Sequence, residues 1–133
     1  MCRLHGMELR FTDREAYRDK AALFQSNYSN DPDAFFIDEG GASANGAKGC
    51  SELINELPDT YDHIFCACGT GTTAAGIING IHSHGLATTF HAIPVFKNGG
   101  FMADEINRYL DHNDNYQLHT GYHFGGYGKT TPQ

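Results

Sequence analysis

Short apolar runs alternate along this chain with polar stretches that show helical periodicity. The runs that predict strands are residues 7–12, 34–38, 63–68 and 88–96. Between them, apolar positions recur at helical spacing after Asp13, around Leu53, from Thr72 to about His84, and from about Phe101 to Leu110. Strands that alternate with helices are typical of βαβ units. The pattern therefore predicts an α/β fold in three layers, with a mostly parallel sheet and helices on both faces.

The pattern also predicts how individual elements are covered and where they end. The run HIFCAC at residues 63–68 is almost continuously apolar, as expected for a strand that is covered on both faces. Residues 39–49 are small and form a predicted loop ahead of a helix that Pro58 ends, and Gly6 is typical of a helix cap. Residues 116–133 alternate briefly and then become glycine-rich.

Length and charge exclude several classes of function. With 133 residues, the chain holds one domain or part of one. Nine Lys and Arg against 16 Asp and Glu give a formal net charge of −7, which argues against nucleic acid as a partner. No stretch approaches the roughly 18 apolar residues of a membrane span, and the N-terminus lacks the features of a signal peptide. We therefore expect a cytoplasmic protein with no membrane partner.

The four cysteines lack the spacing of a disulfide framework. Cys66 and Cys68 alternate within an apolar run, which predicts buried free thiols in a reducing compartment. A nucleophilic cysteine needs an electropositive, partly exposed setting, and a buried strand offers the opposite. The pairs His119 with His123 and His82 with His84 do not supply the three or four converging ligands of a metal site, so no metal is expected.

The most specific local feature is the glycine-rich turn GTGTT at residues 69–73, which follows an apolar strand and opens a helix. Glycines allow a tight turn whose N–H groups point inward, threonines add hydroxyls, and a helix N-terminus favours negative charge. The turn contains no lysine and does not match the P-loop pattern. These features predict a site for one phosphate group.

Two other interpretations of this turn remain open. Gly69, Gly71 and Ala74 satisfy the GxGxxA pattern of dinucleotide-binding domains, but residues 88–96 lack the acidic side chain that would hold the ribose. Alternatively, the glycines only let a helix pack closely against the sheet.

Four segments in a fixed order resemble the 1-aminocyclopropane-1-carboxylate deaminase and D-cysteine desulfhydrase family of pyridoxal-phosphate enzymes, which have the tryptophan synthase β-like fold. The segments are GMELRFTDREAYRDK, EGGASANGAKGC, DHIFCACGTGTTAAG and HFGGYGK. The GTGTTAAG turn is shared by enzymes across the wider fold. The EGG segment and the later GYG segment are more specific and narrow the resemblance to this family. The resemblance implies that residues 1–33 are the end of the small domain with its connecting helix, and that residues 34–133 are part of the cofactor-binding large domain.

The resemblance further implies pyridoxal 5'-phosphate as the cofactor. Its phosphate would be held by Gly69, Thr70, Gly71, Thr72 and Thr73. Tyr127, in GGYG, would lie beside the substrate, where it could orient it or take part in proton transfer. From the residues alone, a tyrosine between two glycines is more typical of an ordinary turn.

For the complete enzyme, the resemblance implies deamination of a small amino acid to a 2-oxo acid and ammonia, with the cofactor as electron sink. The substrate would be D-cysteine or 1-aminocyclopropane-1-carboxylate, and EGG and GYG favour D-cysteine.

The chain departs from the family in one essential respect, because none of its four lysines stands at the position of the Schiff-base lysine. These lysines are Lys20, Lys48, Lys97 and Lys129. We therefore expect the chain by itself to be inactive. Another chain of a homo-oligomer, or the missing part of the fold, would supply the lysine. The alternatives are a non-catalytic module that binds a phosphate ligand and a nucleotide-binding α/β domain.

Overall fold

The computed structural model describes residues 1–112 and 116–130. The chain divides into two compact units, Met1–Phe36 and Ile37–Gln133. Assignment of the chain's parts to a small and a large domain, with a boundary after residue 33, stays a prediction.

The first unit consists of short helices joined by extended chain. It contains the 3₁₀ helices η1 (Cys2–His5) and η2 (Ala16–Arg18) and the helix α1 (Lys20–Tyr28). Gly6 ends η1 in the left-handed conformation, at φ 75°, as the sequence predicts. The helix expected after Asp13 is divided: Asp13 accepts a hydrogen bond from the Ala16 N–H at 2.8 Å, and Asp19 caps α1 by accepting from the Ala22 N–H at 2.9 Å.

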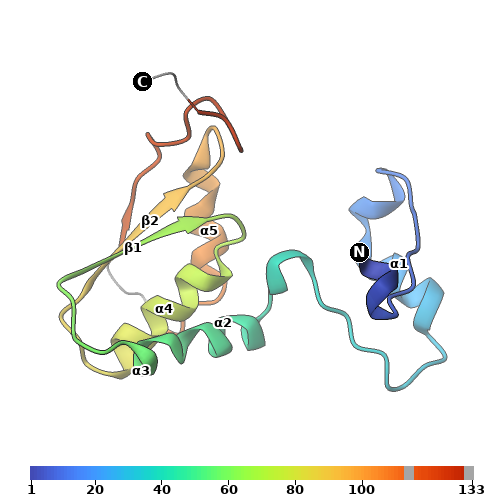
Figure 1. Ribbon diagram of the computed structural model, residues 1–133, viewed down its shortest axis with the longest axis horizontal. Helices are drawn as coiled ribbons and strands as arrows, with labels where there is room; N and C mark the ends of the chain where they lie inside the picture. The colour runs from blue at the N-terminus through green and yellow to red at the C-terminus, as the bar shows by residue number, and fades with distance from the viewer. Residues whose placement is uncertain (113–115, 131–133) are drawn as a thin grey trace. The chain divides into compact units, whose positions relative to one another are not determined.

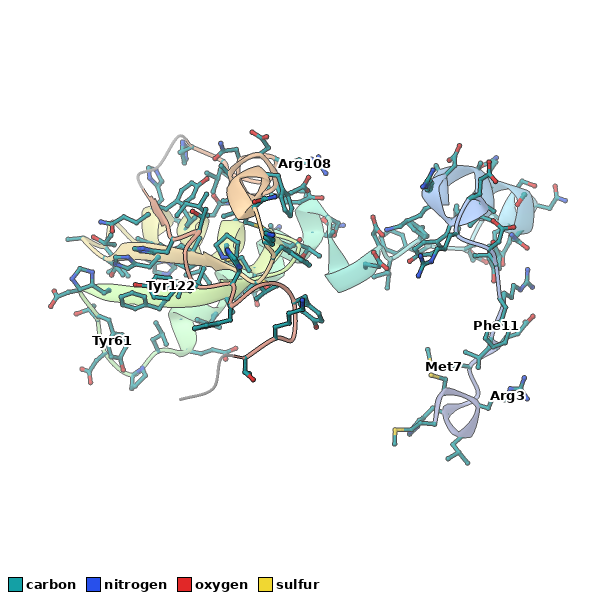
Figure 2. The ribbon with its side chains drawn as sticks, turned by 90° about the horizontal axis from the view of Figure 1, so that it is seen from above. Arg3, Met7, Phe11, Tyr61, Arg108 and Tyr122 are labelled. Atoms are coloured by element: carbon teal, nitrogen blue, oxygen red, sulfur yellow. The ribbon has the colours of Figure 1, made fainter. Side chains whose placement is uncertain are left out.

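The strands predicted at residues 7–12 and 34–38 are wrong, since both segments lack strand structure. Phe11 and Phe35 are 88% and 75% exposed, and Figure 2 shows the Met7 and Phe11 side chains on this extended part of the first unit. An apolar run becomes a strand only where a neighbouring strand takes its backbone hydrogen bonds. Neither segment has such a neighbour among the described residues.

The second unit is a parallel sheet with helices packed against it. Its elements are η3 (Glu39–Gly41), α2 (Ala44–Ser51), α3 (Leu53–Glu56), β1 (His63–Cys68), α4 (Thr72–Ser83), β2 (Thr89–Pro94), η4 (Gly99–Phe101), α5 (Met102–Asn107) and β3 (Tyr116–Leu118). The described strands lie in the order β1-β2-β3, and both neighbouring pairs are parallel. This confirms the predicted α/β fold with a parallel sheet.

The core lies between the sheet and α4, and α2 packs on α4 in turn (Figure 1). Phe90 and Ala92 of β2 contribute to the core together with Ile77 and Ile78 of α4 and Ile106 of α5, all of them at most 4% exposed. Because these helices share one apolar cluster with one face of the sheet, they fix where the carboxyl ends of the strands lie relative to the start of α4.

Two glycines bring α2, α3 and α4 close together. A Cβ atom on Gly76 would lie 2.5 Å from the Cβ of Cys50, and one on Gly80 would lie 2.7 Å from Cγ1 of Ile54 and from the Ser51 carbonyl oxygen. Such glycines permit helix backbones to approach closely. Ser43 caps α2 through the Gly46 N–H at 2.9 Å, so α2 begins inside the loop predicted at residues 39–49.

The expectation that residues 63–68 are covered on both faces is wrong for the described chain. Only alternate residues of β1 face the core, and Phe65, in mid-strand, is 63% exposed. An uninterrupted apolar run cannot distinguish a strand with two covered faces from one whose second face is apolar but open. Among the described residues, no helix is both long and apolar enough to cross a membrane.

Candidate phosphate-binding site

The turn at residues 69–73 joins the carboxyl end of β1 to the first residues of α4. Gly71 precedes the helix in the left-handed conformation, at φ 77° and ψ −16°, and no side chain caps the helix at this end. The first intrahelical hydrogen bond runs from the Ala75 N–H to the Gly71 carbonyl at 2.9 Å. The earlier N–H groups of an α-helix have no partner within it, and with the helix dipole they favour an anion.

The three threonines of this turn lie in different environments. Thr72 is 2% exposed, and its Oγ1 lies 3.2 Å from the Oγ1 of the half-buried Thr70. Thr73 is exposed and accepts a hydrogen bond from the Cys50 thiol at 3.8 Å. One hydroxyl of the Thr70–Thr72 pair donates to the other, which leaves a proton of that pair free for an external acceptor.

The EGG segment packs against this turn. Gly40 and Gly41 have left-handed backbones, at φ 63° and 67°. A Cβ on Gly40 would lie 2.9 Å from Cγ2 of Thr70, and one on Gly46 would lie 3.2 Å from Cγ2 of Thr72. Gly40 was absent from the site residues predicted from the sequence. The sequence feature that could have identified Gly40 is the pair of adjacent glycines, because glycine adopts a left-handed backbone at no steric cost.

Gly71 fits the turn against α5. A Cβ on Gly71 would lie 3.0 Å from the Ile106 backbone nitrogen and 3.1 Å from the Glu105 carbonyl carbon. Gly69 has open space around it, with no atom within 4 Å of an added Cβ. The two glycines of the turn therefore differ: Gly71 is required by the backbone and by α5, whereas Gly69 leaves room above the turn.

Tyr127 lies in a loop of positive-φ residues, namely Phe124, Gly125, Gly126 and Gly128. It is 75% exposed, and its ring stacks on Phe96 with the centroids 5.9 Å apart. Phe96 follows β2, whose continuation pairs with the end of β1 through the Val95 N–H and the Cys68 carbonyl at 3.1 Å. Tyr127 thus belongs to the same carboxyl edge of the sheet as the turn. Among the described interactions, its ring contact is with Phe96 and not with residues 69–73.

The lysines lie on other parts of the chain. Lys20 begins α1 in the first unit, and Lys48 lies on α2 beside a cavity of about 440 Å³. Lys97 follows β2, and Lys129 packs its stem near Gly125. No described hydrogen bond or ion pair joins Lys48, Lys97 or Lys129 to the turn.

The two strand cysteines differ from the buried pair that the sequence predicts. Cys68 is 3% exposed, and its hydrogen bond with Cys66, followed by burial, raises its pKa. Cys66 is only half-buried, and its hydrogen bond with the Cys68 thiol lowers its pKa to about 7. The expectation that both thiols are buried is therefore wrong for Cys66, which packs against the core but stays partly exposed.

Three histidines form a ladder across the sheet. His63 Nδ1 lies 3.0 Å from His91 Nε2, and His91 Nδ1 lies 2.9 Å from His119 Nε2. Burial, followed by the neighbouring His63 and His119, lowers the pKa of His91. The ring nitrogens bond to each other in line rather than converging on one point. Within residues 1–112 and 116–130, no group of three or more His, Cys, Asp or Glu could hold a metal ion.

This geometry fits a phosphate. The uncapped start of α4, the paired hydroxyls of Thr70 and Thr72, and the open space over Gly69 suit a phosphate oxygen cluster. Gly40, Thr70 and Thr72 would form the wall of such a site. The residues present at the turn therefore fit the phosphate end of pyridoxal phosphate.

Among solved structures, the chain is similar to one described as "Crystal Structure Analysis of the ACC deaminase homologue". The TM-score is 0.78 and the identity 23%, and the match covers 98% of this chain and 45% of that one. The chain thus has the fold of part of an ACC deaminase homologue and spans less than half of that protein's length. No protein-family model and no curated protein matches the sequence.

Proposed function

We propose that this chain is the phosphate-binding part of a pyridoxal-phosphate-dependent deaminase or desulfhydrase that acts on a small amino acid. The observation that supports this most directly is the turn between β1 and α4, with Gly71 left-handed, no side-chain cap on α4 and the Thr70–Thr72 hydroxyl pair beside it. The fold similarity to an ACC deaminase homologue supports the same class of enzyme. The substrate would be D-cysteine or 1-aminocyclopropane-1-carboxylate.

In the complete site, each part of this chain would have a defined task. The first-turn N–H groups of α4 and the threonine hydroxyls would hold the phosphate. The bound cofactor would act as the electron sink of the reaction. Tyr127, at the same edge of the sheet, would contact the substrate. The Schiff-base lysine would come from outside this chain, in a homo-oligomer or from the rest of the fold.

Calorimetry with three ligands tests the phosphate site. Pyridoxal phosphate should bind, pyridoxal without its phosphate should bind at least about tenfold more weakly, and Thr72→Ala should weaken pyridoxal phosphate by a similar factor. Thr60→Ala, an exposed threonine outside the turn, is the matched control. Equal binding of pyridoxal and pyridoxal phosphate would contradict the proposal.

Borohydride reduction tests whether the Schiff-base lysine lies outside this chain. After incubation with pyridoxal phosphate, mass spectrometry should find no single lysine that is modified in preference to the others, and the chain alone should release no ammonia from D-cysteine. One specifically modified lysine together with turnover would show that the chain carries its own catalytic amine.

The second candidate function is that of a non-catalytic module that binds a phosphate ligand. It is favoured by the positions of the four lysines, which lie on parts of the chain other than the turn. The same calorimeter distinguishes the two functions. Binding of a nucleotide such as ADP more tightly than pyridoxal phosphate would favour the binding module or a nucleotide-binding domain.

A further inference from the structure

A cavity of about 440 Å³, the α2–α4 cavity, lies apart from the phosphate-binding turn. The helix α2 lies alongside α4 (Figure 1), and the cavity is bordered by both helices and by the segment that follows α5. The turn opens α4 at Thr72, whereas the cavity meets this helix about 10–16 Å farther along its axis. Its volume is within the range of small-molecule sites. Most of its lining is polar, namely Asn45, Lys48, Asn79, Ser83, Tyr109 and Asp111.

One wall of the cavity is fixed by the buried side chain of Asn79. This residue is 9% exposed, and its Nδ2 donates to the Tyr109 carbonyl oxygen at 2.9 Å. Its Oδ1 accepts a hydrogen bond from the Asp111 N–H at 3.0 Å. Release of this segment would leave buried polar groups of Asn79 without partners, which is costly. Tyr109 and Asp111 are therefore held in place beside α4 before any ligand binds.

The opposite wall belongs to α2 and carries the opposite charge. Asn45 and Lys48 lie three positions apart and share one side of this helix. Lys48 brings a positive charge to the cavity and Asp111 a negative one. In the part of the chain that the structure describes, no ion pair uses Lys48 or Asp111, and no hydrogen bond uses the Tyr109 hydroxyl. Two opposite charges thus line one cavity, each without a protein partner among the described residues.

The hydroxyl of Ser83 adds to this polarity. Its Oγ donates to the Gly80 carbonyl oxygen at 3.0 Å, so its proton is used and it offers lone pairs to a ligand. Together with the Asp111 carboxylate, it makes the α4 side of the cavity a set of acceptors, which suits an ammonium group. The ammonium group of Lys48 makes the α2 side suited to a carboxylate.

We propose that the α2–α4 cavity is a binding site for a free amino acid, whose carboxylate pairs with Lys48 and whose ammonium group pairs with Asp111. A ligand with only one of these charges leaves the other side of the cavity without a partner. Apart from the ring of Tyr109, the apolar lining consists of Ala44 and Ala47, which favours an amino acid with a small side chain. This inference does not rest on the proposed function, because neither the turn nor a cofactor takes part.

A nuclear magnetic resonance titration of the ¹⁵N-labelled full chain with L-alanine, without pyridoxal phosphate, tests the site. The amide signals of Lys48 and Asp111 should shift and reach saturation, while those of Gly69 and Thr70 should not move. Propionate lacks the ammonium group of alanine, and ethylamine lacks its carboxylate. Each of these two analogues should bind at least about tenfold more weakly than L-alanine, because each loses one charged hydrogen-bonding group.

Two variants assign the two ends of the ligand. Lys48→Met keeps an unbranched side chain without the charge, so L-alanine should bind about tenfold more weakly and no better than ethylamine. Asp111→Asn should weaken L-alanine to a similar extent and bring it to the level of propionate. Lys97→Met and Asp62→Asn make the same changes at exposed residues outside the cavity. These matched controls should leave the affinity for L-alanine within about twofold.

The proposal is overturned if L-alanine causes no saturable shift, if propionate or ethylamine binds as tightly as L-alanine, or if the control variants weaken binding as much as Lys48→Met and Asp111→Asn. The dispersion of the amide signals of each variant shows whether it is folded, so loss of binding is separated from loss of folding. Because the titration contains no pyridoxal phosphate, its outcome is independent of the calorimetric test of the phosphate site.

Discussion

The two glycines of the phosphate-binding turn should respond very differently to the same substitution. Gly71→Ala places a methyl group on a backbone with φ 77°, 3.0 Å from the Ile106 backbone nitrogen and 3.1 Å from the Glu105 carbonyl carbon. Those atoms belong to the backbone of α5, which cannot rotate away as a side chain could. Gly69→Ala adds its methyl to open space, at a residue without positive φ.

The expected cost can be worked out from these contacts. A left-handed backbone costs a residue with a side chain about 1–2 kcal/mol. Forcing a methyl into well-packed atoms costs about 1–3 kcal/mol more. Gly71→Ala should therefore lower the free energy of unfolding by about 2–5 kcal/mol. Gly69→Ala, which lacks both effects, should change it by no more than about 0.5 kcal/mol.

Urea unfolding followed by circular dichroism, without any ligand, measures this difference. With a slope of about 1–3 kcal/mol per molar urea, Gly71→Ala should unfold at a midpoint lower by about 1 M or more, while Gly69→Ala should unfold close to the wild type. Identical midpoints for the two variants would contradict this expectation, because the backbone of α5 would then not constrain the turn.

Three further predictions concern other parts of the second unit. Gly80→Ala should lower the free energy of unfolding by about 1–3 kcal/mol, because its methyl would lie 2.7 Å from Cγ1 of Ile54. Gly100→Ala, whose methyl would have no atom within 4 Å, should leave the free energy of unfolding unchanged, and urea midpoints of both variants check this. The pKa of His91 is lowered in the folded chain, so the unfolded chain binds protons first as the pH falls. The free energy of unfolding should then be level above about pH 6.5 and decrease below it, less so in His91→Gln; an increase on acidification would contradict this. Cys66, with its pKa lowered to about 7, should react with iodoacetamide near neutral pH well before the buried Cys68, as peptide mass spectrometry would show; equal rates would contradict the difference in burial and pKa between the two thiols.

The part of the fold that was predictable from the sequence is the part where local pattern and tertiary structure agree. The strands at 63–68 and 88–96 appear as β1 and β2, and the helix from Thr72 appears as α4, because each has an apolar face that meets its neighbour. The run at 7–12 has the same apolar character and fails, since whether a run becomes a strand depends on a pairing partner elsewhere in the chain. A single sequence does not show that partner.

The site was predictable to a similar extent. Residues 69–73 were found because glycine, threonine and a following helix start form a pattern within one short segment. The packing of Gly40 on Thr70 joins segments far apart in the chain, and only the close contact of α2 with α4 reveals it. The histidine ladder was missed for the same reason, because its members come from three different strands or their ends and share no local spacing.

The first unit has a consequence for how this protein melts. None of residues 1–36 is buried, and the enthalpy and heat capacity of unfolding arise largely from surface that folding removes from water. A calorimetric scan of the full chain should therefore record the cooperative melting of the second unit almost alone. Substitutions in residues 1–36 can then be compared for their effect on partner binding at a constant melting temperature, without a correction for stability.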